Sequence, residues 1–181
     1  MFVSTDRESR DSSITVQVFE EFAGSLSEWW LESVAECALA VEGECTADAR
    51  RQVGLVIADD DTVRALNKRY RGLDEYTDVL SFSFSHHGHY YGAGESPFER
   101  SAELEFVLPL GEQLALGEVI ISHPQVVRQA EQAAHPVDKE LAILLTHGVL
   151  HLLGYDHEND GDQSEMEKLQ SQILRQVWSD G

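Results

Sequence analysis

The chain has 181 residues, 42% of them hydrophobic, and a formal net charge of −20 from 33 acidic and 13 basic residues. Its length suits one domain with a proper core, and no apolar run approaches the roughly 20 residues of a membrane span. The acidic balance removes the long-range attraction to phosphate that drives ordinary nucleic-acid binding, so it weighs against any nucleic-acid function.

The N-terminal segment, residues 1–13, is polar and mixed in charge, which does not resemble a secretory signal and predicts a disordered tail. The two cysteines, Cys37 and Cys45, are too few for a disulfide framework. These features predict a cytoplasmic protein with no membrane contact.

The first part of the chain alternates strand and helix patterns. Strands are predicted where β-branched or buried apolar residues run together, and helices where apolar residues recur every three to four positions. The expected elements are a strand at 14–19, a helix at 26–41, a strand at 52–58, a helix capped by Asp60 or Asp61 and closing near Gly72, and strands at 78–84 and 116–122.

The last part of the chain has helical patterns only. One helix follows Pro124 and runs to about residue 135, a second follows Pro136, and a third runs from about residue 160 to Trp178. This order predicts an α+β (mixed α/β) fold: a single domain over residues 14–181, with a central mixed sheet of about four strands packed by helices.

Residues 86–114, between the last two predicted strands, have the composition of a long loop. His86, His87 and His89 stand at its start, but adjacent histidines point apart and no rigid element positions them. A loop is therefore the favoured interpretation, and a metal site there is the weaker one.

The most informative motif is His147-x-x-x-His151-x-x-Gly154-x-x-His157. Residues four apart on a helix lie about 40° apart on one face, and a glycine ends a helix in the left-handed turn that lets the chain double back. Three converging imidazoles with a fourth position left for water form an open, hydrolytic zinc site on a late helix and its exit turn. A lone histidine would more often decorate the helix; three at this spacing favour a metal.

The same spacing occurs in the metzincin metalloproteases, in which a glutamate follows the first histidine and serves as general base. Here that position is Gly148, and Met166 lies in a helical pattern rather than in a turn under the metal. Loss of the base removes roughly 10²–10⁴ in rate, so a peptidase is a distant alternative.

With the motif in view, the chain resembles the YbeY family, metal-dependent endoribonucleases that mature ribosomal RNA. The signature His-Gly-x-Leu-His-Leu-x-Gly-Tyr-Asp-His is complete at 147–157, and similar blocks stand at 66–82, at 116–122 and at Glu140-Leu141. The resemblance spans about residues 14–175. Tyr76 and Ser83 replace prolines that are usual in the family, and the 86–114 loop is longer than usual.

The resemblance implies one zinc ion held by His147, His151 and His157, and a functional arginine at Arg71. An arginine fork suits two phosphate oxygens; from sequence alone, Arg71 is equally well a cation satisfying the end of its helix. Asp156 is a candidate proton carrier and equally a turn residue.

Two further sets of residues are weaker candidates, one for the proton carrier and one for RNA binding. Glu118 and Asp78 are expected at strand positions facing the site or its rim. Lys68 and Arg69, with Arg64 and Arg71, form a basic strip that binds RNA or is only a solvated helix face.

Three functions remain open. The first, implied by the resemblance, is a single-strand-specific, zinc-dependent endoribonuclease in maturation of the small-subunit 3′ end of ribosomal RNA and in ribosome quality control. Its partners would be RNA and the ribosome or its associated proteins, with no DNA. The second is a zinc hydrolase of another substrate class, such as a metalloprotease. The third is a non-catalytic maturation factor with structural zinc, which a fourth protein ligand would favour.

Overall fold

The computed structural model describes residues 13–42, 51–84, 114–155 and 160–178. These residues form four strands and five α-helices in the predicted order, and the predicted α+β class is confirmed. The elements are β1 (Ile14–Val18), α1 (Glu28–Leu39) with a 3₁₀ turn at Ala40–Glu42, β2 (Arg51–Ala58), α2 (Asp60–Arg71), β3 (Val79–Ser83), β4 (Leu114–Ser122), α3 (His123–Gln132), α4 (Val137–Leu152) and α5 (Asp160–Val177).

The four strands form one mixed sheet in the order β1-β2-β4-β3. β1 and β4 pair with β2 in parallel, and β3 pairs with β4 antiparallel. Among the described residues β3 is therefore an edge strand, and it packs against α4.

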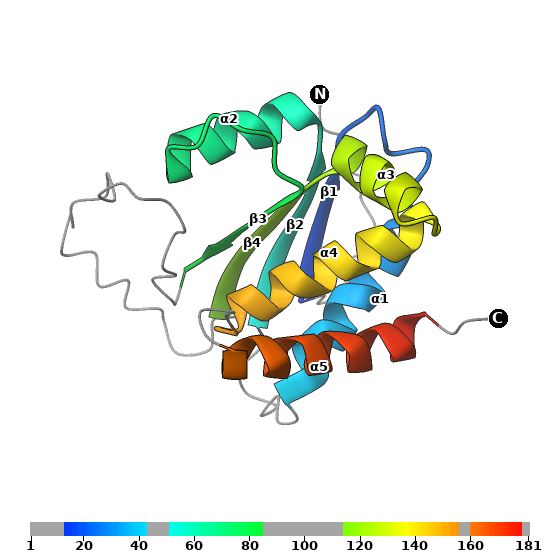
Figure 1. Cartoon of the computed structure of the whole chain (residues 1–181), viewed down its shortest axis with the longest axis vertical. Helices are drawn as coiled ribbons and strands as arrows, with labels where there is room; N and C mark the ends of the chain where they lie inside the picture. Colours follow the sequence, from blue (N-terminus) through cyan, green and yellow to red (C-terminus); the bar gives the residue numbers. More distant parts are fainter. Residues whose placement is uncertain (1–12, 43–50, 85–113, 156–159, 179–181) are drawn as a thin grey trace.

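Helices cover the two faces of the sheet unequally (Figure 1). α1, α4 and α5 pack together on one face, α2 lies on the other, and α3 packs on α4 where β4 ends. No helix in the described part of the chain is long and apolar enough to cross a bilayer.

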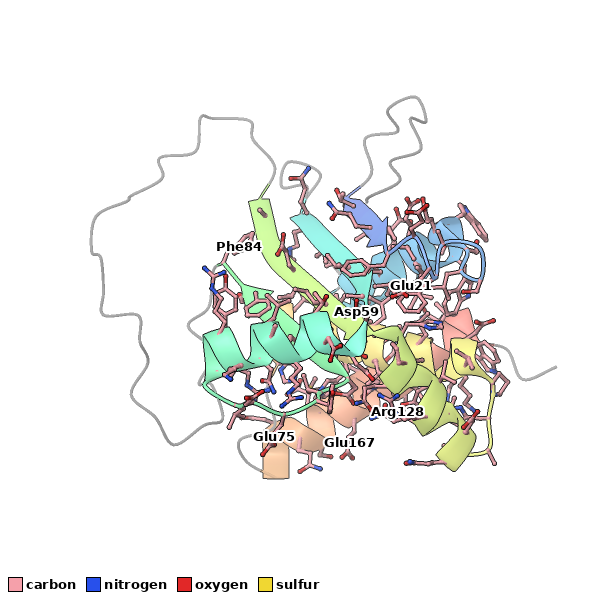
Figure 2. All side chains as sticks on the ribbon, turned by 90° about the horizontal axis from the view of Figure 1, so that it is seen from above. Glu21, Asp59, Glu75, Phe84, Arg128 and Glu167 are labelled. Atoms are coloured by element: carbon pink, nitrogen blue, oxygen red, sulfur yellow. The ribbon has the colours of Figure 1, made fainter. Side chains whose placement is uncertain are left out.

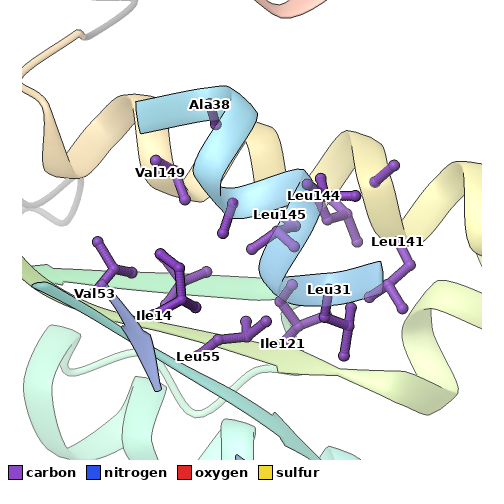
Figure 3. Packing of buried hydrophobic residues seen from close by; sticks show 14 of the residues in the cluster. Ile14, Leu31, Ala38, Val53, Leu55, Ile121, Leu141, Leu144, Leu145 and Val149 are labelled. Atoms are coloured by element: carbon purple, nitrogen blue, oxygen red, sulfur yellow. The ribbon is translucent and has the colours of Figure 1, made fainter. Parts of the chain in front are cut away.

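The main core lies between the sheet and the helices α1, α4 and α5 (Figure 3). Alternate residues of the strands, such as Leu55 and Ile121, meet Leu31 of α1 and Leu145 of α4, and all four are fully buried. Met166 of α5 is also buried here, as its helical pattern predicted. α4 is thus apolar around most of its surface because it is enclosed by the sheet and three helices.

The face under α2 has a smaller apolar cluster and more polar joints. Of the residues that the structure describes, Ala58, Val63, Leu80 and Ile120 are buried in it. The N-cap of α2 is Asp59, whose carboxylate accepts a hydrogen bond from the Thr62 amide at 2.7 Å. The predicted cap at Asp60 or Asp61 was wrong.

Asp60 does not cap α2, and its side chain instead bonds to other elements. Its carboxylate accepts hydrogen bonds from the hydroxyl of Ser122 and from the guanidinium of Arg128, both at 2.5 Å. Asp60 therefore joins the start of α2 to the end of β4 and to α3.

Candidate metal centre and its surroundings

The side chains of His147 and His151 come together on the last two turns of α4. Their Nε2 atoms are 3.0 Å apart, the ring centroids are 4.5 Å apart and the ring planes stand at 89°. Both side chains are half-buried. The i, i+4 spacing on one helical face brings two imidazole nitrogens to nearly the same point, as the sequence predicted.

Gly148, between the two histidines, is a point of close approach between α4 and the sheet. A Cβ atom built there would lie 2.6 Å from Cγ1 of Val119 and 3.2 Å from Oγ of Ser81. The Ser81 hydroxyl donates a hydrogen bond to the carbonyl of Gly148 at 3.2 Å. The helix is therefore held against β3 and β4 at the residue between the histidines.

This contact also bears on the metalloprotease alternative. A glutamate at position 148 would need the space that the side chains of Val119 and Ser81 occupy. The general base of the metzincins is absent from the sequence, and the packing leaves no room for it.

The exit from α4 has the geometry that Gly154 predicted. Gly154 has a φ of 94°, its amide donates to the carbonyl of His151, and the amide of Tyr155 donates to the carbonyl of Leu150, both at 3.1 Å. This pair of hydrogen bonds is a Schellman ending, and Tyr155 packs against the core beyond it. The chain thus leaves the helix by a fixed turn.

His157 and Asp156 follow that turn and lie outside the described residues, so the third ligand and the proton carrier stay predictions. Within the described ranges no group of three His, Cys, Asp or Glu side chains is placed to hold a metal. His86, His87 and His89 also lie outside these ranges.

The histidine pair nevertheless fits zinc. Two nitrogen ligands of a tetrahedral zinc ion, each about 2.0–2.1 Å from the metal, are about 3.3–3.4 Å apart. The Nε2 atoms of His147 and His151 already stand close to this separation. A small opening of the pair would admit the ion, and imidazole is a ligand that zinc prefers.

Arg71 is the last residue of α2, and its side chain is half-buried. Gly72 follows with a φ of 72° and closes the helix, because its amide donates a hydrogen bond to the carbonyl of Lys68 at 3.1 Å. Because α2 and α4 pack on opposite faces of the sheet, Arg71 and the histidine pair lie on different sides of it.

The predicted basic strip is divided in the structure. Asp74, in the segment after α2, pairs with Arg64 at 2.8 Å and with Lys68 at 2.7 Å. A hydrogen bond from Lys68, and to a smaller extent one from Arg64, lowers the pKa of Asp74. Arg69 instead lies over the ring of Tyr70, with its Cζ 5.2 Å from the centroid. The charges of Arg64 and Lys68 are thus partly balanced by one carboxylate.

Glu118 does not lie where the sequence placed it. Val119 faces Gly148 of α4, so its neighbour Glu118 points to the opposite face of the sheet, where it contacts Gly54. The side chain is exposed there. Glu118 therefore does not face the histidine pair, and the other expected position, at the rim of the site, stays a prediction.

Asp78 connects β3 to its neighbouring elements through hydrogen bonds. Its carboxylate accepts hydrogen bonds from the Val79 amide and from the side-chain amide of Gln129, each at 2.8 Å, and its carbonyl accepts the Ser122 amide. These bonds fix the start of β3 to β4 and α3. The sequence placed Asp78 in a strand and did not indicate these partners.

The contact between Ser81 and Gly148 was not predicted from the sequence. Both residues stand inside motifs that had been noted, but their partnership is between positions far apart in the chain. Close approach by a helical glycine is a known signal of such contacts, and here it identifies the residue pair that fixes the metal helix on the sheet.

Comparison with known proteins agrees with this arrangement. The family model described as "Endoribonuclease YbeY" matches residues 16–178. A protein of that name from Dehalococcoides mccartyi is 39% identical over 93% of this chain and 91% of its own length. One from Moorella thermoacetica is 40% identical over 81% of this chain and 84% of its own length.

A solved structure is similar as well. The solution structure of a Thermotoga maritima protein has 25% sequence identity and a TM-score of 0.55, and the match covers 91% of this chain and 89% of that one. The fold, the histidine pair on α4 and these matches lead to one conclusion: the chain belongs to the YbeY endoribonuclease family.

Proposed function

We propose that this protein is a zinc-dependent endoribonuclease that cleaves single-stranded RNA. The observation that carries the proposal is the convergence of the His147 and His151 Nε2 atoms, 3.0 Å apart, beside a glycine where a peptidase would need its base. Membership in a family of endoribonucleases supplies the substrate class.

His147 and His151 would hold the ion together with His157, which leaves one position for water. When bound, zinc lowers the pKa of such a water toward about 7 and so supplies hydroxide at neutral pH. The ion would thus supply the water oxygen for hydrolysis of a phosphodiester, in which the bond from phosphorus to the ribose oxygen would be replaced by one to the water oxygen and the ribose oxygen would take a proton.

The other residues act on charge and on protons. The guanidinium of Arg71 would bind phosphate oxygens and stabilise the charge that builds on them. Lys68 and Arg69 would contact the RNA backbone beyond the cut. Asp156, next to a ligand in the sequence, would deliver the proton to the leaving oxygen.

The net charge of −20 sets a condition on this function. RNA is repelled at long range, so few phosphate contacts would drive binding. We infer that the ribosome or its associated proteins present the RNA, and that the substrate is ribosomal RNA near the small-subunit 3′ end, in the cytoplasm.

The test compares substrates with one zinc-loaded preparation. A single-stranded fragment of ribosomal RNA should be cut, whereas the same sequence in a duplex, and casein, should stay intact. Cleavage of casein without RNA cleavage would overturn the proposal in favour of a peptidase. Zinc retained by a fourth protein ligand, with no cleavage of any RNA, would favour a structural zinc instead.

A further inference from the structure

The end of α2 and the end of β3 form an aromatic surface on the face of the sheet opposite to α4. We define this surface, the Phe84 platform, as Arg69, Tyr70, Phe82 and Phe84. The rings of Tyr70 and Phe82 meet edge to face, with centroids 5.1 Å apart and planes at 66°. The guanidinium of Arg69 lies over the ring of Tyr70.

Phe84 is the exposed end of this surface. Leu80 and Phe82 pack with the apolar cluster under α2; β3 ends at Ser83, and its alternation extended by one residue puts Phe84 on the same face. The Phe84 amide continues the ladder with a 2.9 Å bond to the carbonyl of Leu116. Phe84 thus stands about 7 Å beyond Phe82, at the end of β3 (Figure 2), with 65% of its surface exposed.

The charges around the platform favour a base over a phosphate. Glu118 is exposed on the same face, directly across the ladder from Phe82, so its charge offsets the attraction of Arg69 for a phosphate group. A nucleobase is uncharged and planar, and it stacks on aromatic rings and on arginine. Arg71, next to Tyr70 at the end of α2, can take the backbone phosphate.

The position of β3 connects this surface to the metal helix. Ser81 contacts Gly148 on one face of β3, and Phe82 contacts Tyr70 on the other. A single strand lying across this edge would present a phosphate to the histidines and a base to the platform. A base paired in a duplex is not free to do so.

We propose that Phe84 is a stacking subsite for one unpaired base of the RNA substrate. The inference rests on the proposed function, because it assumes that RNA is bound. It adds a residue that selects single strands, and it makes Phe84 a substrate-binding residue rather than a participant in bond cleavage.

The experiment measures binding by stopped-flow anisotropy, before cleavage, to a labelled single-stranded oligoribonucleotide of about 12 nucleotides. Stacking on an aromatic side chain contributes about 1–3 kcal/mol per base, so F84A should weaken binding about 5- to 150-fold. F84L should weaken it similarly because it lacks a ring face, and F84W should restore it.

Two controls isolate the base. Trp29 of α1 is 66% exposed, nearly the same as Phe84, so W29A is a matched loss of a surface ring away from the platform and should bind as wild type does. An oligonucleotide without bases should bind F84A and wild type equally, since only the backbone contacts remain. Thermal unfolding should show that all variants are folded.

Three outcomes would overturn the inference. F84A would bind the RNA as tightly as wild type does, or F84A would lose as much affinity for the base-free oligonucleotide as for the RNA. The third outcome is that RNA binding does not quench the indole fluorescence of F84W. If another part of the chain covers Phe84, the F84W indole would also be shielded from iodide without RNA. Wild-type cleavage and KM in F84A would remove the subsite and leave the nuclease standing. Base-dependent binding without any RNA cleavage would support the subsite and remove the proposed nuclease.

Discussion

The two faces of the sheet are held by different forces. On the α4 face, fully buried side chains fill the space between the strands and three helices, and Gly148 lets α4 touch β3 and β4 directly. On the α2 face only a few side chains are buried, and the segment after α2 is held by exposed ion pairs to Asp74. Close packing is rigid, whereas exposed ion pairs are weak and screened by salt. The structure thus places His147 and His151 on the rigid side and Arg71 on the adjustable one.

The largest difference should appear when one leucine is truncated on each face. L145A removes a fully buried side chain from α4 and should cost about 2–5 kcal/mol in the free energy of unfolding. L66A removes a half-buried side chain from α2 and should cost less, because its neighbours can relax into the space. Urea unfolding of both variants measures the comparison, and equal costs would contradict it.

Adding one carbon at position 148 tests the contact between α4 and the sheet. G148A should lower the free energy of unfolding by about 1–3 kcal/mol, because its Cβ atom overlaps Val119. It should also weaken zinc binding, since the histidines on either side move with the helix. G24A is the control, because a Cβ atom there meets nothing within 4 Å; a G148A variant as stable as G24A would refute the close packing.

The end of α2 should be sensitive to backbone conformation rather than to packing. G72A places a side chain at a φ of 72° in open space, so it should cost about 1–2 kcal/mol through strain alone. Cleavage should fall with zinc content unchanged, since Arg71 moves and the histidines do not. Loss of zinc in G72A would show that the two sides are not independent.

The smallest effect should come from the ion pairs of Asp74. The pKa of Asp74 is lowered by Lys68 and Arg64, so its contribution to stability is present above the ordinary carboxyl value of 3.8 and is lost as the pH falls through the lowered pKa. D74N should therefore lower the melting temperature slightly at pH 7, less than G72A does. The difference should shrink in high salt and below about pH 4; a difference that persists in acid would point to another cause.

The sequence was most informative where structure is local. The spacing of His147 and His151, the turn at Gly154 and the end of α2 at Gly72 all follow from patterns within a few residues, and the structure confirms them. The number of strands and their alternation with helices followed from the same kind of pattern. These features depend on backbone conformation that nearby residues determine.

Features that depend on contacts between distant residues were not predicted. The side of the sheet that Glu118 faces was not predicted, because the pairing of β2 with β4 contains a β-bulge. The register shifts between Gln52 and Val53 of β2, so Leu116 and Glu118 of β4 do not share a face. Gly117, with a φ of 148°, allows this irregularity and marks it in the sequence only as a glycine within a strand. The pairing of Asp74 with Arg64 and Lys68 was missed because the chain folds back along α2 after Gly72.

The most direct test of the account is to measure zinc content and RNA cleavage together in H147A, H151A and H157A. The wild-type chain should bind one zinc ion, and each variant should lose both the ion and the cleavage of single-stranded RNA while remaining folded. If H151A keeps its zinc and still cuts RNA, the imidazoles on α4 do not form the metal centre, and the proposed mechanism is wrong.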